Sequence, residues 1–273
     1  MIRNLLICTT SGLVLFTKDF PDATPQPRLL GSLLTTILEF SVLTAGMPLS
    51  YIEMENLSVT MAGNESTKLL CALLHDKEDG PQFSRIIAAE ILSTFQEEYA
   101  GDLGAGGLNL KDFHGFHYRL GDVLKRSIQP VINKLGLVRG VLKVVLVTEN
   151  SQTYQTSEVD QLGMLANLQA LVALGTDIMR VYQDTVECLS FEGGPPNGGS
   201  VGSNNVGSGG SNLSNDGTRI LVKRVDRSML VVLTSQSIAP SKYRGHIDEA
   251  VTTLLKLSEL GAALGTRWGS VLK

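Results

Sequence analysis

Two pairs of nearby polar residues have the types and spacing that could do chemistry. His114 and His117 (HGFH) could lie on one helix face and hold a metal ion, but no Cys, Asp or Glu cluster with ligand spacing completes such a site. His75 and Asp76 resemble half of a catalytic dyad, yet they stand in a polar loop with no nucleophile motif such as G-x-S-x-G nearby. Structural or solvent-facing roles are therefore favoured for these residues.

The glycine-rich stretches at 101–107 and 193–210 do not match a phosphate-binding loop. Neither contains the pattern G-x-x-x-x-G-K-[ST], and neither has the Lys that would reach a phosphate group. We interpret both stretches as linkers. With no metal-binding cluster and no phosphate loop, the sequence predicts a protein that is not an enzyme and that needs no cofactor or metal.

The three cysteines, Cys8, Cys71 and Cys188, are far apart, and each lies in an apolar run. An odd and scattered set is not typical of a disulfide framework. Cys71 and Cys188 fall on predicted strands with no base nearby that could activate a thiol. Free, buried cysteines in a reducing compartment are the simpler interpretation.

The bulk composition favours a folded protein that binds neither nucleic acid nor the membrane interior. The 273 residues are 43% hydrophobic and 18% charged, which is enough apolar material for a core. The net charge is -4, with no block of Lys or Arg that could neutralise phosphates. No run of about 18 apolar residues is present, and no cleavable signal peptide follows the first residues. We therefore expect a cytoplasmic protein.

The first hundred residues predict the element order ββαβββα. Ser11-Gly12 supplies the turn of an initial hairpin, and Gly46-Met47-Pro48 ends the first helix. Apolar residues recur at the helical period in the two helical segments. The expected elements are strands at 2–10 and 13–17, a helix at 27–45, strands at 49–54, 56–62 and 67–74, and a helix from Pro81 to about Tyr99.

The second half repeats this pattern of a hairpin, a helix, further strands and a helix. Pro130 lies inside the first helical pattern and should kink or split it. The stretch at 193–217 is low-complexity and falls between two strands, where added length is tolerated. The expected elements are a helix at 117–135, strands at 140–147 and 152–156, a helix at 158–182, strands at 186–191, 219–225 and 228–234, and a helix at 242–260.

The predicted helix at 158–182 is apolar over much of its circumference. A helix on an open sheet normally keeps one polar side, so this helix is either buried on both sides or faces a partner. We favour a dimer or partner interface, formed by Leu165, Leu168, Leu171, Val172 and Leu174.

Two families resemble the two halves of the chain. The hairpin MIRNLLICTT…GLVLFTKDF and the helices LLGSLLTTILEFSVLTAG and GPQFSRIIAAEILSTFQEEY resemble a longin domain over 1–100. NKLGLVRGVLKVVLVTENSQTY, DQLGMLANLQALVALGTDIM and RILVKRVDRSMLVVLTS resemble the roadblock family over 117–262, with an insertion at 193–217 that departs from the family pattern. A Gly-rich linker at 101–116 would join them, and 263–273 would be a tail. The resemblance implies an α/β (α+β) fold of two small domains, each a mainly antiparallel five-stranded sheet packed with helices.

The resemblance also implies binding rather than catalysis. Such domains assemble through sheet edges and helix faces, and many bind or regulate small GTPases, although a fold alone does not fix a function. The function expected is a non-catalytic interaction subunit or regulator in a membrane-trafficking or small-GTPase complex. It would form a homo- or heterodimer through the roadblock-like half and reach endomembranes only peripherally, through partners. The alternative is a scaffold subunit of a cytoskeletal-motor or signalling complex.

The sequence does not say whether such a regulator exchanges nucleotide, activates hydrolysis or only tethers a GTPase. Arg139, Arg224 or Arg227 could serve as an inserted arginine finger, but no motif selects one of them. The part that Trp268 plays in the tail is equally open.

Overall fold

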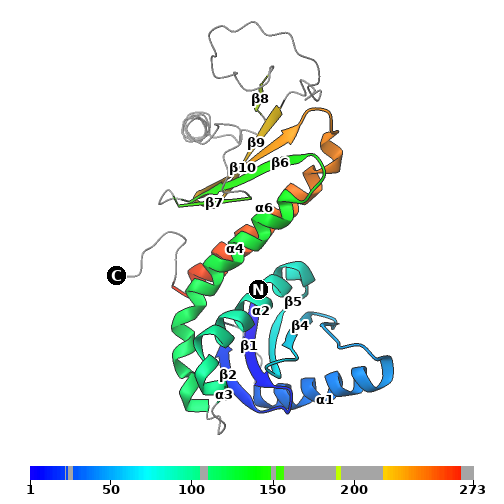
Figure 1. The fold of residues 1–273 in the computed structure, drawn as a ribbon, viewed down its shortest axis with the longest axis vertical. Helices are drawn as coiled ribbons and strands as arrows, with labels where there is room; N and C mark the ends of the chain where they lie inside the picture. Colours follow the sequence, from blue (N-terminus) through cyan, green and yellow to red (C-terminus); the bar gives the residue numbers. More distant parts are fainter. Residues whose placement is uncertain are drawn as a thin grey trace, which may run out of the picture. The chain divides into compact units, whose positions relative to one another are not determined.

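The computed structural model of the chain describes residues 1–21, 23, 27–104, 110–148, 152–156, 189–191 and 218–265 (Figure 1). The described residues fall into two compact units. One consists of residues 1–128 together with residues 256–265, and the other of the residues described between 129 and 255.

The first unit has a five-stranded sheet in which every neighbouring pair of strands is antiparallel. The strand order is β2-β1-β5-β4-β3. Together with the two long helices α1 and α2, these strands have the order ββαβββα that the sequence predicts (Figure 1). The bounds are β1 (Ile2–Thr9), β2 (Val14–Asp19), α1 (Pro27–Ala45), β3 (Tyr51–Glu53), β4 (Leu57–Asn64), β5 (Leu69–Asp76), a 3-10 turn η1 (Lys77–Asp79) and α2 (Gly80–Glu98).

The two helices cover opposite faces of this sheet, because successive side chains of a strand point to opposite faces. On β5, Leu74 belongs to the cluster that contains Leu34 of α1. The next residue, His75, lies on the other face and contacts Thr60 of β4, which in turn contacts Ser84 of α2. The face toward α1 is apolar, whereas the face toward α2 includes this buried polar group.

The segment predicted as a linker, 101–116, is helical over all the residues described in it, 101–104 and 110–116. A short helix α3 spans Ala100–Gly104, and a 3-10 helix η2 spans Leu110–Arg119. Phe113 and Phe116 of η2 are fully buried in the first unit. Their spacing of three residues places both on one side of a 3-10 helix. The glycines of 101–108 led us to interpret the whole segment as a linker, although the two phenylalanines that follow belong to the core.

An aromatic cluster holds η2 against the sheet and α2. The ring of Phe116 lies 5.2 Å from that of Phe16 on β2 and 5.0 Å from that of Phe95 on α2, both in edge-to-face geometry. Phe113 lies 5.3 Å from Phe95 and 5.0 Å from Tyr99. Such pairs are worth about 0.5–1.5 kcal/mol each beyond the area they bury, so η2 contributes to the stability of the unit.

The end of the last helix, α6 (Arg244–Ala263), also belongs to the first unit. Leu260 is 3% exposed, and with Leu264 it lines a small cavity together with Ile2, Leu5 and Phe20. On the same helix, the Nζ atom of Lys256 donates to the carbonyl oxygen of Glu78 at 2.7 Å and lies 3.5 Å from the carboxylate of Asp79. The core of the first unit therefore needs residues from both ends of the described chain.

The second unit has a second five-stranded antiparallel sheet in the order β7-β6-β10-β9-β8. Its strands confirm the predicted α/β fold of two five-stranded sheets packed with helices. Residues 158–182, 193–217 and 266–273, and with them the predicted long helix, the insertion and Trp268, lie outside the described residues. The bounds are α4 (Leu120–Gly136), β6 (Val141–Val147), β7 (Thr153–Gln155), β8 (Leu189–Phe191), β9 (Thr218–Val225), β10 (Ser228–Ser235) and η3 (Pro240–Lys242).

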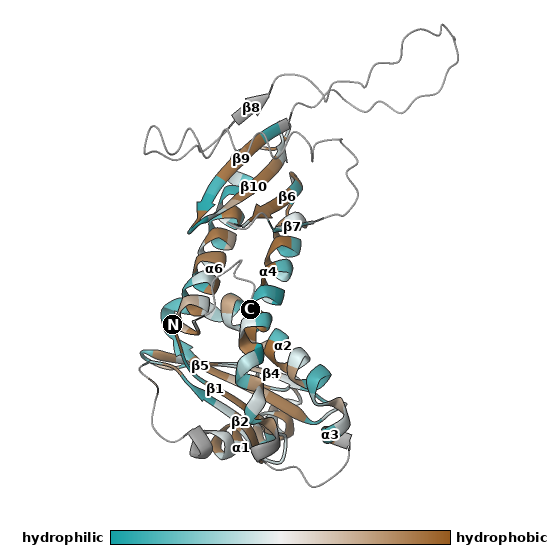
Figure 2. Cartoon of the chain, turned by 90° about the vertical axis from the view of Figure 1, so that its left-hand side faces the viewer, coloured by the Kyte–Doolittle hydropathy of each residue, from teal (hydrophilic) through white to brown (hydrophobic). Residues whose placement is uncertain are grey.

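Apolar side chains dominate the central strands of both sheets. Figure 2 shows these strands largely in brown, while α4 and α6 carry both brown and teal residues. In the second sheet the register places Val231 of β10 beside Val145 of β6 and Val222 of β9, and all three are buried. β-branched residues in register across three strands pack well on a pleated surface, which favours this pairing.

Pro130 was predicted to kink or split α4, and the helix continues through it without a split. A proline inside a helix removes one main-chain hydrogen bond and costs about 3 kcal/mol. The neighbours Ile128, Val131 and Ile132 are each buried, at 4% exposure or less. Burial of such side chains contributes about 1.5–3 kcal/mol each, which outweighs the defect.

Glu90 on α2 gives the first unit a pH-dependent stability. It is half-buried, and burial raises the pKa of its carboxyl above the ordinary value of 4.5, although Arg126 partly offsets this. The unfolded chain releases this proton at lower pH than the folded chain, so Glu90 lowers the free energy of unfolding as the pH rises from about 4.5 through its folded pKa. Glu90→Gln is expected to remove this decline, so that the variant gains stability relative to wild type between pH 4 and pH 7. Denaturant unfolding at several pH values measures this difference in stability. If the free energies of unfolding of the two proteins change in parallel with pH, the prediction is wrong.

Candidate functional site: an apolar groove beside helix α1

The C-terminal half of α1 exposes large apolar side chains to solvent. Phe40 is 65% exposed, Leu43 is 85% exposed, and Met47, just after the helix, is 68% exposed. Glu39 is the only charged residue between 31 and 50. A helix that is apolar around its circumference is normally buried, so this half of α1 has the composition of an element covered by another surface.

A groove of about 610 Å³ runs between this part of α1 and the ends of β4 and β5. Its volume lies in the range of sites that bind ligands or short segments of a partner. Most of its lining is apolar, with two carboxylates, Glu39 and Glu65, and no Lys or Arg. The apolar lining comes from Leu38, Val42, Leu43, Leu49, Met61 and Leu70.

The groove exists because the chain turns back along α1 without filling the space beside β4. Gly46 ends the helix with a φ of +69°, and its N–H donates to the carbonyl oxygen of Val42 at 3.0 Å. The N–H of Leu49 then donates to Oγ of Ser41 at 3.2 Å, which holds the returning chain against the helix. On β4, Gly63 has no side chain, and the nearest atoms to a Cβ placed there are 3.9 Å away.

One edge of β4 is open beside this groove. The short strand β3 pairs with β4 only from Tyr51↔Thr60 to Glu53↔Ser58, and the N–H of Met61 reaches the carbonyl of Ser50 at 2.9 Å. Within the described part of the chain, no strand pairs with residues 62–64 on that side. The groove thus offers both an apolar lining and main-chain groups.

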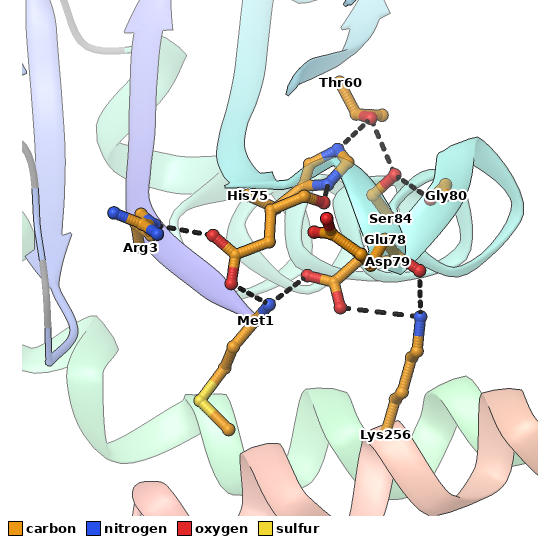
Figure 3. Close-up of polar contacts among 10 residues, drawn as sticks. Met1, Arg3, Thr60, His75, Glu78, Asp79, Gly80, Ser84 and Lys256 are labelled. Carbon is orange, nitrogen blue, oxygen red and sulfur yellow. Dashed lines mark hydrogen bonds and ion pairs between the residues drawn. The ribbon is translucent and has the colours of Figure 1, made fainter. Parts of the chain in front are cut away.

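His75 and Asp76 do not form a catalytic dyad. His75 is 0% exposed, and its Nδ1 contacts the main-chain carbonyl of Asp76 at 2.8 Å instead of the carboxylate (Figure 3). The Asp76 carboxylate lies 2.8 Å from the amine of Met1 and 2.6 Å from Nε of Arg3. Burial alone would raise the pKa of Asp76, but hydrogen bonds from these two cations outweigh it and hold the pKa below its usual value.

His114 and His117 are exposed on η2, and Nδ1 of His117 contacts the carbonyl of His114 at 2.6 Å. No group of three or more metal-binding side chains occurs within the described ranges. Cys8 and Cys71 are free and buried, and burial raises the pKa of Cys8 to about 11 and raises that of Cys71 as well. Both thiols are therefore protonated and unreactive at neutral pH.

The three candidate arginine fingers do not converge. Arg139 lies in the turn before β6, and Arg224 and Arg227 lie at the β9–β10 turn. The register of β6 against β10 pairs Val141 with Thr234 and Val147 with Met229, so these turns are at opposite ends of the sheet. The predicted interface of Leu165, Leu168, Leu171, Val172 and Leu174 lies outside the described residues, as does Cys188.

Sequence reasoning missed the groove because it treated α1 only as a core helix. The stripe of Leu34 and Leu38 does face the sheet, as expected. The overlooked signal was the position of Phe40, Leu43 and Met47 off that stripe, in a stretch almost free of charge. Apolar residues on the second side of an otherwise amphipathic helix indicate a second contact surface.

Among the helices that the structure describes, none has the length and hydropathy needed to cross a bilayer.

Comparisons with known proteins find similarity only among solved structures. No family model matches the sequence, and a search of curated proteins finds no match. The chain is similar to MglB of Myxococcus xanthus, with 18% identity and a TM-score of 0.34 over 49% of this chain and 95% of that chain. The fold described above rests on the strand order and register of this chain itself.

Proposed function

We propose that this chain is a non-catalytic interaction protein that binds a partner protein through the groove beside α1. The observation that carries the proposal is the exposure of Phe40, Leu43 and Met47 next to an apolar groove. Covering these three side chains would contribute roughly 1.5–3 kcal/mol each. Large exposed apolar patches of this kind mark interaction surfaces in soluble proteins.

The charge of the groove favours a partner segment that is apolar and carries Lys or Arg. Glu39 and Glu65 lie in the lining without a basic residue among the lining residues. A basic side chain on the partner would meet these carboxylates at the rim, where complementary charge improves the rate and specificity of binding. The apolar positions of the segment would fill the space beside Leu38, Val42 and Met61.

The partner class we propose is a small GTPase or another subunit of a membrane-trafficking complex. The resemblance of the two halves to longin and roadblock domains supports this choice. The protein would act in the cytoplasm and reach membranes through its partners. A non-catalytic role is supported by the buried state of His75, Thr60 and Ser84, whose polar atoms contact one another and the main chain.

Affinity purification of the tagged protein from native cytosol, followed by mass spectrometry, tests the proposal. We expect stoichiometric recovery of a small GTPase or trafficking subunits, and direct binding of the purified partner in the absence of other proteins. Recovery of motor or signalling subunits in their place would assign the groove to a different complex. A chain that is recovered alone, with no partner that binds it directly, would overturn the proposal.

A further inference from the structure

A chain of four polar contacts is buried on the α2 face of the first sheet, opposite the groove (Figure 3). Nδ1 of His75 lies 2.8 Å from the carbonyl oxygen of Asp76, and Nε2 lies 2.9 Å from Oγ1 of Thr60. Oγ1 of Thr60 lies 2.7 Å from Oγ of Ser84, which lies 2.9 Å from the carbonyl oxygen of Gly80. The side chains of His75, Thr60 and Ser84 are all 0% exposed, so water does not complete these contacts.

The number of protons in this chain depends on the charge of His75. Both ends of the chain are carbonyl oxygens, which can only accept. A neutral imidazole supplies one N–H, and the two hydroxyl groups supply one O–H each, which makes three protons for four contacts. The imidazolium ion supplies a second N–H and therefore the fourth proton. The chain is complete only when His75 is charged.

The extra proton changes the direction of both hydroxyl groups. When the ring is neutral, Nδ1–H faces the Asp76 carbonyl, and Nε2 must accept the proton of Thr60. Ser84 then donates to Thr60, because two hydroxyl oxygens only 2.7 Å apart need a proton between them, and the longer contact with Gly80 at 2.9 Å has no proton. When the ring is charged, Nε2–H donates to Thr60, Thr60 donates to Ser84, and Ser84 donates to the carbonyl of Gly80.

We propose that His75, Thr60 and Ser84 form a proton-operated hydrogen-bond relay that sets the hydrogen bonding of the first turn of α2. Gly80 is the first residue of that helix, so the state of the relay is transmitted from β5 through β4 to the helix start. This device uses residues that the groove does not, and it is independent of the function proposed above.

The groups around the ring set its titration below the ordinary pKa of histidine. Burial lowers the pKa of His75 from 6.5, the contact with the Asp76 carbonyl and the carboxylates of Asp79 and Asp76 raise it, and the amine of Met1 lowers it. Tyr51 of β3 also faces the ring, with centroids 6.3 Å apart, and its hydroxyl contacts Oγ of Ser58 at 2.9 Å. The net direction is downward, so the relay reverses below pH 6.5.

Nuclear magnetic resonance on the full chain tests the relay. We expect the ring nitrogens of His75 to show the neutral form with the proton on Nδ1 at pH 8. On acidification, the carbonyl carbon of Gly80 should shift with the same midpoint as the His75 ring. A neutral form with the proton on Nε2, or a Gly80 signal that stays flat while His75 titrates, would overturn the proposal. Loss of the folded spectrum before His75 takes up its proton would do the same.

Two variants and a matched control separate the relay from simple packing. Ser84→Ala should abolish the Gly80 shift and lower the midpoint of His75, because the charged state loses two hydrogen bonds and the neutral state loses one. Thr60→Val should also lower the midpoint, since it removes the acceptor of a charged donor. Ser127→Ala removes an equally buried hydroxyl that donates four residues back, to Val123, and it should change neither readout. Equal midpoints in wild type and both relay variants would refute the relay.

Discussion

Replacing Leu43 with aspartate is expected to reduce partner recovery at least about tenfold while leaving the melting temperature unchanged. Leu43 is 85% exposed and lines the groove, so the folded monomer tolerates a charge there. A bound partner segment would bury that carboxylate beside Glu39 and Glu65 in an apolar surface, which weakens binding. A loss of about 1.4 kcal/mol in binding free energy corresponds to a tenfold loss of affinity. Quantitative pull-down and thermal unfolding of the same preparations measure the two quantities.

Leu137 offers a matched control for this variant. It is 88% exposed, follows α4 and is not one of the residues that line the groove. Leu137→Asp introduces the same charge at the same kind of exposed position, and partner recovery is expected to stay at the wild-type level. If Leu43→Asp retains its partner, or if both variants lose it equally, the groove is not the binding surface.

Truncating Phe116 to alanine is expected to destabilise the protein by about 3–5 kcal/mol, the usual cost of removing a buried phenylalanine. The ring is fully buried and meets Phe16 and Phe95 edge-on, so its loss leaves a cavity between β2, α2 and η2. Denaturant unfolding monitored by circular dichroism measures the change. The result distinguishes a core helix at 110–119 from the linker that the glycine content of the segment predicts.

The neighbouring Tyr118 provides the control, since it is 75% exposed in the same 3-10 helix. Tyr118→Ala should change the free energy of unfolding by no more than about 0.5 kcal/mol. Equal effects of the two substitutions would mean that η2 does not pack against the first unit as described.

The elements that sequence predicted well are those fixed by local chemistry. The β1–β2 hairpin turns at Gly12, which has a φ of +88°, and the β9–β10 hairpin turns at Asp226, which has a φ of +53°. Gly46 and Pro48 end α1 where expected, and the apolar period places Ile87, Ile91 and Phe95 of α2 in the core. In each case a few neighbouring residues determine the outcome, so no knowledge of the rest of the fold is needed.

The features that sequence missed depend on residues brought together by the fold. The groove arises where α1 extends past its contacts with the sheet, and the length of β3 decides how much of β4 is left open. The buried relay joins β4, β5 and α2, and no local pattern marks Thr60 or Ser84 as partners of His75. The core positions of Phe113 and Phe116 were not predicted for the same reason, because their partners lie on β2 and α2.

The place of the α6 end in the first unit has a consequence for biosynthesis. Residues 1–128 leave the ribosome well before Lys256, Leu260 and Leu264, which complete the same unit. At about 5–20 residues per second, the intervening 127 positions (129–255) take on the order of ten seconds to translate. During that interval Ile2, Leu5 and Phe20 lack part of their final cover. The nascent chain therefore presents an unfinished apolar surface that a chaperone can hold until the last helix emerges.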